Sequence, residues 1–297
     1  MSETEIGFIG LGLMGAAMVS RLQDKGYPLT IVANRSRAPI DAAVARGAKE
    51  VGTAREVAEN SDIVMLCMDT SASVEARMRG ADGVIAGLRQ GAVVVDFGTS
   101  LPESTRALGE EVAAAGGQLL DGPLGRTPQH ALDGLLNIMT AGDKAAFDRV
   151  EPVLKDLGEN VFHLGALGSG HTIKLLNNFI GMTMANAFSE AFVMADKAGI
   201  PREVVYDVMA AGPVHSGMMD MIKAYAVDED ATKLAFAIKN GTKDIGYYQQ
   251  MANSAGITAS VSAAPLANMK EAIEQGHGDA MVSELVDFYS EKYSGDG

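Results

Sequence analysis

Short apolar runs alternate with longer amphipathic stretches through the first half of the chain. The apolar runs predict β-strands, and the stretches between them predict helices, for example over residues 14–25, 103–115 and 144–156. This alternation is typical of a largely parallel sheet covered by helices on both faces. The predicted strands are residues 6–9, 29–33, 63–67, 93–96, 118–120, 135–141 and 161–164.

The alternation stops at a cluster of three glycines, Gly165, Gly168 and Gly170. After it, residues 171–198 form one long periodic stretch that is apolar on nearly every side, which predicts a buried helix. We therefore expect an α/β domain over residues 1–166, followed by an all-helical domain over residues 167–297. The further helices are predicted over residues 202–211, 216–226, 236–254, 262–275 and 280–291.

A glycine-rich turn joins the first predicted strand to the first predicted helix. Its spacing is G-x-G-x-x-G within a βαβ unit that ends near residue 33. Such a turn brings backbone N–H groups and a helix N-terminus to a pyrophosphate, which predicts a Rossmann-type, doubly wound dinucleotide-binding domain. The residues expected to contact the cofactor here are Gly10, Leu11, Gly12, Leu13, Met14 and Gly15.

The end of the second predicted strand bears on the choice of cofactor. Sites for NAD carry Asp or Glu there, whereas this chain has Asn34, Arg35 and Ser36. Arg35 is suited to pair with a 2′-phosphate, and Ser36 to donate a hydrogen bond to it. The sequence therefore favours NADP(H), with NAD(H) as the alternative. A polar turn without a cofactor role is the competing interpretation.

Candidate chemistry appears at the start of the long helix. Lys174 and Asn178 are four residues apart and share one helical face, and His171 precedes Lys174 by three residues. A buried lysine and asparagine cost desolvation energy, and burial lowers the pKa of a lysine toward values that suit proton transfer. We expect this pair to be catalytic and His171 to contact the substrate. A lysine that reaches solvent beside a structural asparagine is the alternative.

At these positions the chain resembles the β-hydroxyacid dehydrogenases, the relatives of 3-hydroxyisobutyrate dehydrogenase. The resemblance covers essentially the whole chain. It is carried by the ordered motifs at residues 10–15 (GLGLMG), 96–100 (DFGTS), 121–124 (DGPL), 134–139 (GLLNIM), 170–178 (GHTIKLLNN) and 243–246 (KDIG).

The resemblance implies roles at the matching positions. Lys174 would be the general acid in reduction and the base in oxidation, and Asn178 would orient the substrate. Lys243 would contact the cofactor, and Met68 and Thr99 would lie along its nicotinamide. The implied activity is an NAD(P)-dependent interconversion of a small aldehyde and its β-hydroxy acid.

One segment departs from the family pattern. Where the family has Ser-Gly-Gly for the substrate carboxylate, this chain has Gly125, Arg126 and Thr127. A guanidinium and a hydroxyl suit an anion with three acceptor oxygens. This segment resembles the sulfolactaldehyde reductase branch, which implies reduction of 3-sulfolactaldehyde to 2,3-dihydroxypropane-1-sulfonate. The alternative is that Arg126 pairs with a structural carboxylate of the chain.

Other functions are kept as alternatives. If Arg126 pairs with a structural carboxylate, the expected substrate is succinic, tartronic or methylmalonic semialdehyde, glyoxylate, or 3-hydroxyisobutyrate itself. An imine reductase generally lacks the lysine that stands at Lys174. A non-catalytic nucleotide-binding protein would not need Lys174 and Asn178 together.

Composition excludes several classes of partner. The formal net charge of −14 disfavours nucleic acid and anionic membranes. The five histidines have no metal-ligand spacing, so we expect no metal site. Neither a signal peptide nor an apolar stretch long enough to span a membrane is evident, which predicts a cytoplasmic protein. The helices rich in Ala, Met and Leu predict a homodimer or homotetramer.

Overall fold

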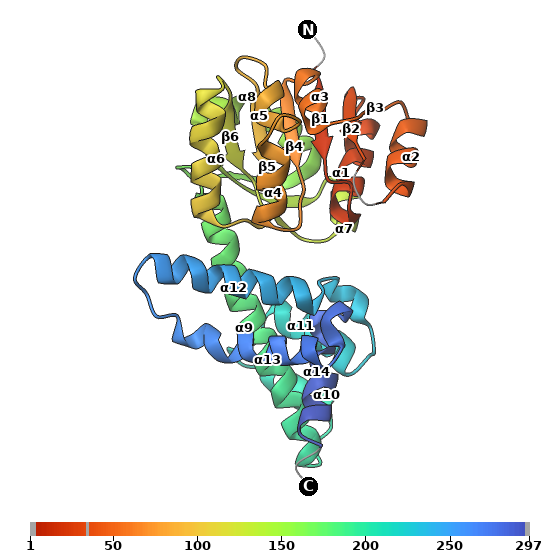
Figure 1. The fold of residues 1–297 in the computed structure, drawn as a ribbon. Helices are drawn as coiled ribbons and strands as arrows, with labels where there is room; N and C mark the ends of the chain where they lie inside the picture. Colours follow the sequence, from red (N-terminus) through yellow and green to blue (C-terminus); the bar gives the residue numbers. More distant parts are fainter. Residues whose placement is uncertain (1–3, 34–35, 295–297) are drawn as a thin grey trace. The chain divides into compact units, whose positions relative to one another are not determined.

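The computed structural model describes residues 4–33 and 36–294. The described chain folds as two compact units, the first ending at Lys174 and the second beginning at Leu175. The first unit is an α/β domain and the second is entirely helical apart from an isolated bridge between Ala237 and Met281 (Figure 1). The predicted fold class, a doubly wound sheet followed by a helical domain, is therefore confirmed.

A nine-stranded sheet forms the centre of the first unit. Its order is β3-β2-β1-β4-β5-β6-β8-β7, and β9 pairs with β8. The strands from β3 to β6 are parallel, whereas β8 runs antiparallel to both β6 and β7. The strands are β1 Ile6–Ile9, β2 Leu29–Val32, β3 Lys49–Val51, β4 Ile63–Leu66, β5 Val93–Asp96, β6 Gln118–Asp121, β7 Leu124–Gly125, β8 Leu136–Gly142 and β9 Gly158–His163.

Helices cover both faces of this sheet (Figure 1). On one face Met65 and Val95 belong to a core that α1 and α8 complete, and on the other face Val64 and Val94 pack into a second core. Burial on both faces explains why the central strands are continuous apolar runs. The helices of this unit are α1 Leu13–Asp24, α2 Ala38–Ala45, α3 Ala54–Glu59, α4 Ser71–Met78, α5 Val84–Gly87, α6 Pro102–Ala114, α7 Pro128–Asp133 and α8 Lys144–Leu157.

Two strands, β3 and β7, were not predicted from the sequence. β3 is an edge strand in which Lys49 and Glu50 are exposed, so it leaves no apolar run. β7 consists of Leu124 and Gly125 alone, at the other end of the strand order. β9 begins at Gly158, three residues before the predicted start. The prediction missed these first residues because they do not form an apolar run.

The second unit is built around the helix α9, Ser169–Lys197, whose N-terminal turns belong to the first unit. Phe188 and Phe192 of α9 pack with Ile222, Ile245 and Phe288 from three other helices. The other helices are α10 Arg202–Ala210, α11 Gly217–Ala226, α12 Ile238–Ser254, α13 Ala263–Glu274 and α14 Leu285–Lys292.

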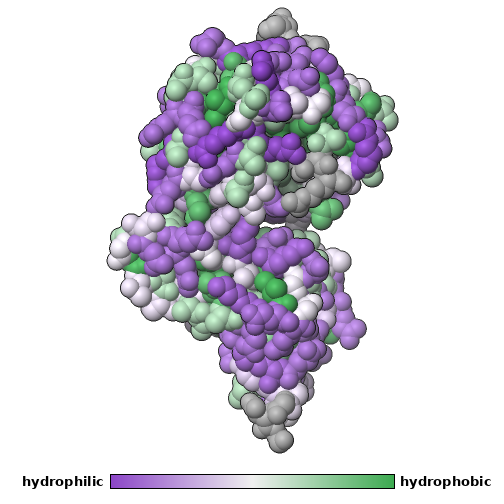
Figure 2. All heavy atoms as spheres, in the orientation of Figure 1, coloured by the Kyte–Doolittle hydropathy of each residue, from purple (hydrophilic) through white to green (hydrophobic). Residues whose placement is uncertain are grey.

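The expectation that the long helix is buried on every side is wrong for this chain. Ile180 and Met194 of α9 are 55% and 58% exposed, and Val208 of α10 is 70% exposed. On the face drawn in Figure 2, hydrophilic residues predominate and hydrophobic ones lie between them in small groups. No helix of the described residues is long and apolar enough to cross a membrane.

Candidate active site

The glycine-rich turn connects β1 to α1 and depends on glycine for steric reasons. Gly10 has a φ of +99°, and a Cβ there would lie 2.4 Å from the carbonyl oxygen of Cys67. A Cβ on Gly15 would lie 2.0 Å from the carbonyl oxygen of Gly10. These two glycines therefore let α1 pack closely against the ends of β1 and β4.

Gly12 serves a different purpose. It is the N-cap of α1 with φ −73° and ψ −166°, which any residue adopts, and a Cβ on it would meet no atom within 4 Å. Within the described chain no side chain caps α1 at this end, so the first-turn N–H groups are its donors there. The helix N-terminus thus presents N–H groups and partial positive charge to an anion, and Gly12 leaves the approach open.

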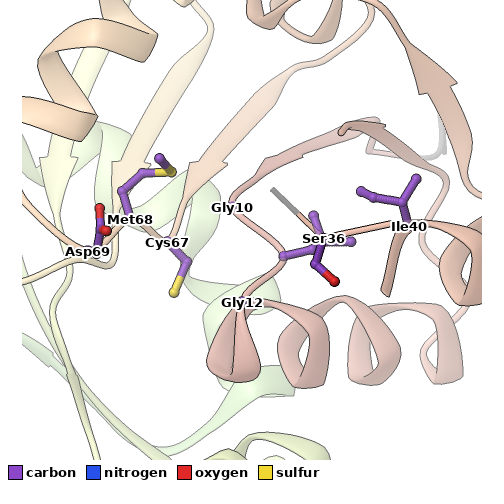
Figure 3. Close-up of a pocket in the computed structure, with 8 residues that line it drawn as sticks. Gly10, Gly12, Ser36, Ile40, Cys67, Met68 and Asp69 are labelled. Atoms are coloured by element: carbon purple, nitrogen blue, oxygen red, sulfur yellow. The ribbon is translucent and has the colours of Figure 1, made fainter. Parts of the chain in front are cut away.

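A pocket lies at this turn. It receives residues from the ends of β1 and β4 and from the start of α2, which is where parallel sheets of this type bind dinucleotides. Gly12 and Ser36 lie across the pocket from Cys67 and Met68 (Figure 3). The lining residues are Gly10, Leu11, Gly12, Ser36, Ile40, Cys67, Met68 and Asp69.

Several predicted cofactor contacts meet at this pocket. Gly10, Leu11, Gly12, Ser36 and Met68 line it, whereas Leu13 and Met14 lie in the first turn of α1. The pocket is also lined by Ile40, Cys67 and Asp69, which were not predicted as cofactor contacts. Burial raises the pKa of the Cys67 thiol to about 12, so this sulfur stays neutral near pH 7.

The residues expected to select the cofactor lie mostly outside the described chain. Asn34 and Arg35 are outside it, whereas Ser36 is exposed at the rim of the pocket. The neighbouring Arg37 is held by two carboxylates: its Nη1 and Nη2 donate to Glu50 at 2.6 and 2.7 Å, and its Nε donates to Asp41 at 2.7 Å. Arg37 is therefore engaged within its own domain.

The loop after β5 carries Thr99 and is fixed by a buried carboxylate. Asp96 accepts hydrogen bonds from the Gly98 N–H at 2.8 Å and from the Ser100 hydroxyl at 2.9 Å. Thr99, between these two donors, is half-buried. Because β4 and β5 are parallel neighbours, Met68 and Thr99 follow strand ends at the same edge of the sheet.

The start of α9 carries Lys174 and His171. Lys174 is half-buried, whereas the His171 side chain is completely buried. The Nδ1 of His171 lies 2.8 Å from the Thr105 hydroxyl, and its Nε2 lies 3.7 Å from a carboxylate oxygen of Asp96. This placement supports a role for His171 inside the domain, and contact with the substrate stays a prediction.

In the second unit, Asn178 is held by a buried carboxylate. Its Nδ2 donates to Asp244 Oδ2 at 2.6 Å, and both residues are more than 90% buried. Lys243 forms an ion pair with Asp244 at 2.9 Å, and its Nζ lies 5.1 Å from the centre of the Tyr247 ring. The bond to Asp244 fixes the amide so that Asn178 Oδ1 is the acceptor.

The predicted substrate-anion segment runs from the last residue of β7 to the N-cap of α7. Arg126 has a φ of +77°, and its Nη1 donates to the Leu135 carbonyl at 2.6 Å and to Glu159 at 2.5 Å. Gly125 pairs with Asn137 of β8, and the Thr127 hydroxyl lies 2.7 Å from His130 Nδ1. None of the three lines the pocket at the glycine-rich turn.

In the described part of the chain, no three His, Cys, Asp or Glu side chains are grouped so that they could hold a metal ion. The geometry instead fits a dinucleotide. The uncapped N-terminus of α1, the open approach at Gly12 and the pocket between strand ends form a cradle for a pyrophosphate. These features define a dinucleotide-binding protein.

Comparison with known proteins agrees and identifies the family. Residues 5–165 match the family model described as the NAD binding domain of 6-phosphogluconate dehydrogenase. Residues 168–289 match the one described as NAD-binding of NADP-dependent 3-hydroxyisobutyrate dehydrogenase. The chain belongs to the β-hydroxyacid dehydrogenases related to 3-hydroxyisobutyrate dehydrogenase, as the sequence motifs predicted, and it is an NAD(P)-dependent oxidoreductase.

Several relatives are named as reductases or dehydrogenases of small aldehydes and hydroxy acids. The chain is 30% identical to glyoxylate/succinic semialdehyde reductase 1 of Arabidopsis thaliana, over 95% of this chain and 97% of that one. It is 34% identical to 2-hydroxy-3-oxopropionate reductase of Escherichia coli K12, over 73% and 74% of the two chains. A Mycobacterium tuberculosis 3-hydroxyisobutyrate dehydrogenase with L-serine shares the fold, with a TM-score of 0.84 at 23% identity over 96% and 98%.

Proposed function

We propose that this protein uses NADPH to reduce a small anionic aldehyde to its hydroxy acid, with Lys174 as the proton donor. The supporting observation is the arrangement on α9. Lys174 is half-buried, and Asn178 follows it by one helical turn with its amide oriented by Asp244. An ammonium group and an amide oxygen on one helical face suit a carbonyl oxygen that takes up a proton.

The chemistry divides between the cofactor and the chain. A reduced nicotinamide, when bound, would supply the hydride for the carbonyl carbon and would itself be oxidised. The Nζ of Lys174 gives a proton to the carbonyl oxygen as its π electrons become a lone pair, so the product is an alcohol. Asn178 Oδ1 accepts a hydrogen bond from that hydroxyl or from the ammonium group. In the reverse direction Lys174 takes the proton back.

Replacement of Lys174 tests this proposal. Lys174→Ala should lower kcat by roughly 10²- to 10⁴-fold and leave the dissociation constant of NADPH nearly unchanged, because a general acid is lost while the glycine-rich turn is intact. Lys197→Ala, at the exposed C-terminal end of the same helix, is the matched control and should retain full activity. Normal turnover of Lys174→Ala would refute the assignment.

The preference for NADP(H) over NAD(H) belongs to the same proposal. It rests on Arg35 and Ser36 in the sequence and on the pairing of Arg37 with Glu50, which leaves Arg35 as the candidate partner of the 2′-phosphate. Titration of both reduced cofactors, followed by nicotinamide fluorescence, should give tighter binding of NADPH. Arg35→Asp should reverse the preference by repulsion of the phosphate. Tighter NADH binding by the unaltered protein would contradict it.

The anionic group of the substrate is the next question. Arg126 already donates to Glu159 and to the Leu135 carbonyl, which favours a carboxylate aldehyde over a sulfonate. The named relatives reduce glyoxylate, succinic semialdehyde or 2-hydroxy-3-oxopropionate, which are also carboxylates. We therefore place a carboxylate semialdehyde first. 3-Sulfolactaldehyde is the second candidate, since Arg126 and Thr127 replace the family's Ser-Gly-Gly.

A side-by-side assay separates the two candidates by their kcat/KM values. It sets the sulfonate substrate, 3-sulfolactaldehyde, against four carboxylates: glyoxylate and the succinic, tartronic and methylmalonic semialdehydes. We expect a carboxylate to lead by at least roughly tenfold, about 1.4 kcal/mol. A lead for the sulfonate that disappears in Arg126→Ala and grows in Glu159→Gln, which releases the guanidinium, would establish the second candidate instead.

We also propose that the chain assembles as a homodimer or homotetramer. The supporting feature is the set of large apolar side chains left exposed on the helices of the second unit. They include Ile180, Met194, Val204, Val208 and Val261. Burial of exposed apolar area is the usual driving force for closed, symmetric assemblies.

A further inference from the structure

The helix that carries Lys174 receives its N-terminal cap from a distant residue. Gly168 precedes α9 and has no side chain to supply a cap. Asp121, at the end of β6, takes this role: its Oδ1 accepts from the Gly168 N–H at 2.8 Å, and its Oδ2 accepts from the His171 N–H at 2.7 Å. The Asp121 side chain is completely buried, so these bonds do not compete with solvent.

Two glycines allow the helix to start directly on this carboxylate. Gly168 has a φ of +90°, a conformation that favours glycine. A Cβ on Gly170 would lie 2.1 Å from the Met139 carbonyl oxygen and 2.8 Å from Asp121 Oδ2. The position of the first turn of α9 is therefore set by β6 and β8 of the sheet.

A second contact fixes the same turn. The hydroxyl of Thr105, on α6, lies 2.8 Å from Nδ1 of His171 and also donates to the Leu101 carbonyl at 3.1 Å. His171 is thus bound at its backbone by Asp121 and at its ring by Thr105. Lys174 follows His171 by three residues and lies on the adjacent turn of the same face.

We propose that Asp121 is a positioning residue for Lys174 and acts, together with Thr105, by fixing the first turn of α9. This inference rests on the proposed function, since it matters only if Lys174 donates the proton. A misplacement of about 1 Å at a reacting group costs on the order of 100-fold in rate. Loss of the cap should therefore act mainly on the chemical step.

The central experiment compares two aspartates that both cap helices in this domain. Asp121→Asn keeps the shape of the side chain and replaces one acceptor by a donor. Asp143→Asn makes the same change at the cap of α8, where Asp143 accepts from the Ala146 N–H at 2.8 Å. We expect Asp121→Asn to lower kcat by roughly 10- to 100-fold, with NADPH binding unchanged. We expect the kcat of Asp143→Asn to stay within about twofold of the unaltered protein, since α8 carries none of the proposed catalytic residues.

A deuterium isotope effect separates positioning from a general loss of structure. With NADPH deuterated at the transferred hydrogen, the effect on kcat should increase in Asp121→Asn, because a misplaced proton donor makes the chemical step more rate-limiting. It should not change in Asp143→Asn. If Asp121→Asn does not fold, Thr105→Val decides: it removes only the hydroxyl, and a several-fold lower kcat with a larger isotope effect is expected.

The outcomes distinguish this inference from the proposed function. If Lys174→Ala is inactive but Asp121→Asn behaves like Asp143→Asn, the positioning role is wrong and the proton donor stands. If Asp121→Asn cannot be measured and Thr105→Val has an unchanged kcat and isotope effect, the positioning role is also wrong. If Lys174→Ala keeps normal turnover, the proposed function itself fails.

Discussion

Gly12 is the glycine whose replacement should separate cofactor binding from folding. Its backbone lies at φ −73° and ψ −166°, and a Cβ on it meets no atom within 4 Å. Gly12→Ala therefore introduces neither strain nor a clash in the free protein. The substitution should change the stability of the fold by less than about 1 kcal/mol, because the smaller conformational freedom of alanine in the unfolded chain offsets its poorer fit at an N-cap.

The same methyl group should weaken cofactor binding. It projects at the N-cap of α1, where the pyrophosphate must approach the first-turn N–H groups. Hydrogen bonds to a charged group contribute about 1.5–3 kcal/mol each, so the loss of one predicts a dissociation constant roughly 10- to 150-fold higher. Nicotinamide fluorescence titration measures the affinity, and thermal unfolding without cofactor measures the stability.

Gly15→Ala is the comparison. A Cβ there would lie 2.0 Å from the backbone oxygen of Gly10, so this variant should lose about 1–3 kcal/mol of stability through overpacking. If Gly12→Ala bound NADPH as tightly as the unaltered protein, or lost stability as Gly15→Ala does, the assignment of the open N-terminus to the pyrophosphate would be refuted.

Three further predictions concern stability and assembly. Burial raises the pKa of Asp121, so this carboxyl stabilises the fold below its unfolded pKa of about 3.9 and loses that contribution as pH rises through the native value. In urea unfolding, the stability difference between Asp121→Asn and the unaltered protein should therefore shift in favour of the variant as pH rises above about 3.9, and a shift in the opposite direction would mean that the pKa of Asp121 is lowered in the folded protein. Thr53→Ala removes the capping box that Thr53 forms with Glu56 and should cost about 0.5–2 kcal/mol in the same assay, whereas no change would show that the cap contributes nothing. Light scattering at micromolar concentration should give the mass of a dimer or tetramer, and a monomer mass would contradict the proposed assembly.

The parts of the fold that could be predicted are those whose signal is local. β1, β4 and β5 are buried on both faces, so each is an uninterrupted apolar run that stands out in the sequence. β3 was missed because Lys49 and Glu50 face solvent at the edge of the sheet. The glycine-rich turn could be recognised because its requirements, a positive φ and two close approaches, fall within six residues.

The contacts that could not be predicted join residues far apart in the chain. Asp121 and the N–H groups that it caps are separated by 47 and 50 residues. Arg126 and Glu159 are separated by 33 residues, and only the fold shows that this arginine has a carboxylate partner. The spacing rules of helices and strands do not extend over such distances, so the sequence named Arg126 and His171 without their partners.

The division of the chain at Lys174 bears on how proteins of this family diversify. The first compact unit ends at this residue, so the proposed proton donor is encoded together with the glycine-rich turn. Asn178 and Lys243 are encoded with the helical unit. An exchange of the helical unit with its junction just after Lys174 would therefore also replace Asn178, the proposed partner of Lys174 on α9. For that reason we expect the two units to change together rather than as separate modules.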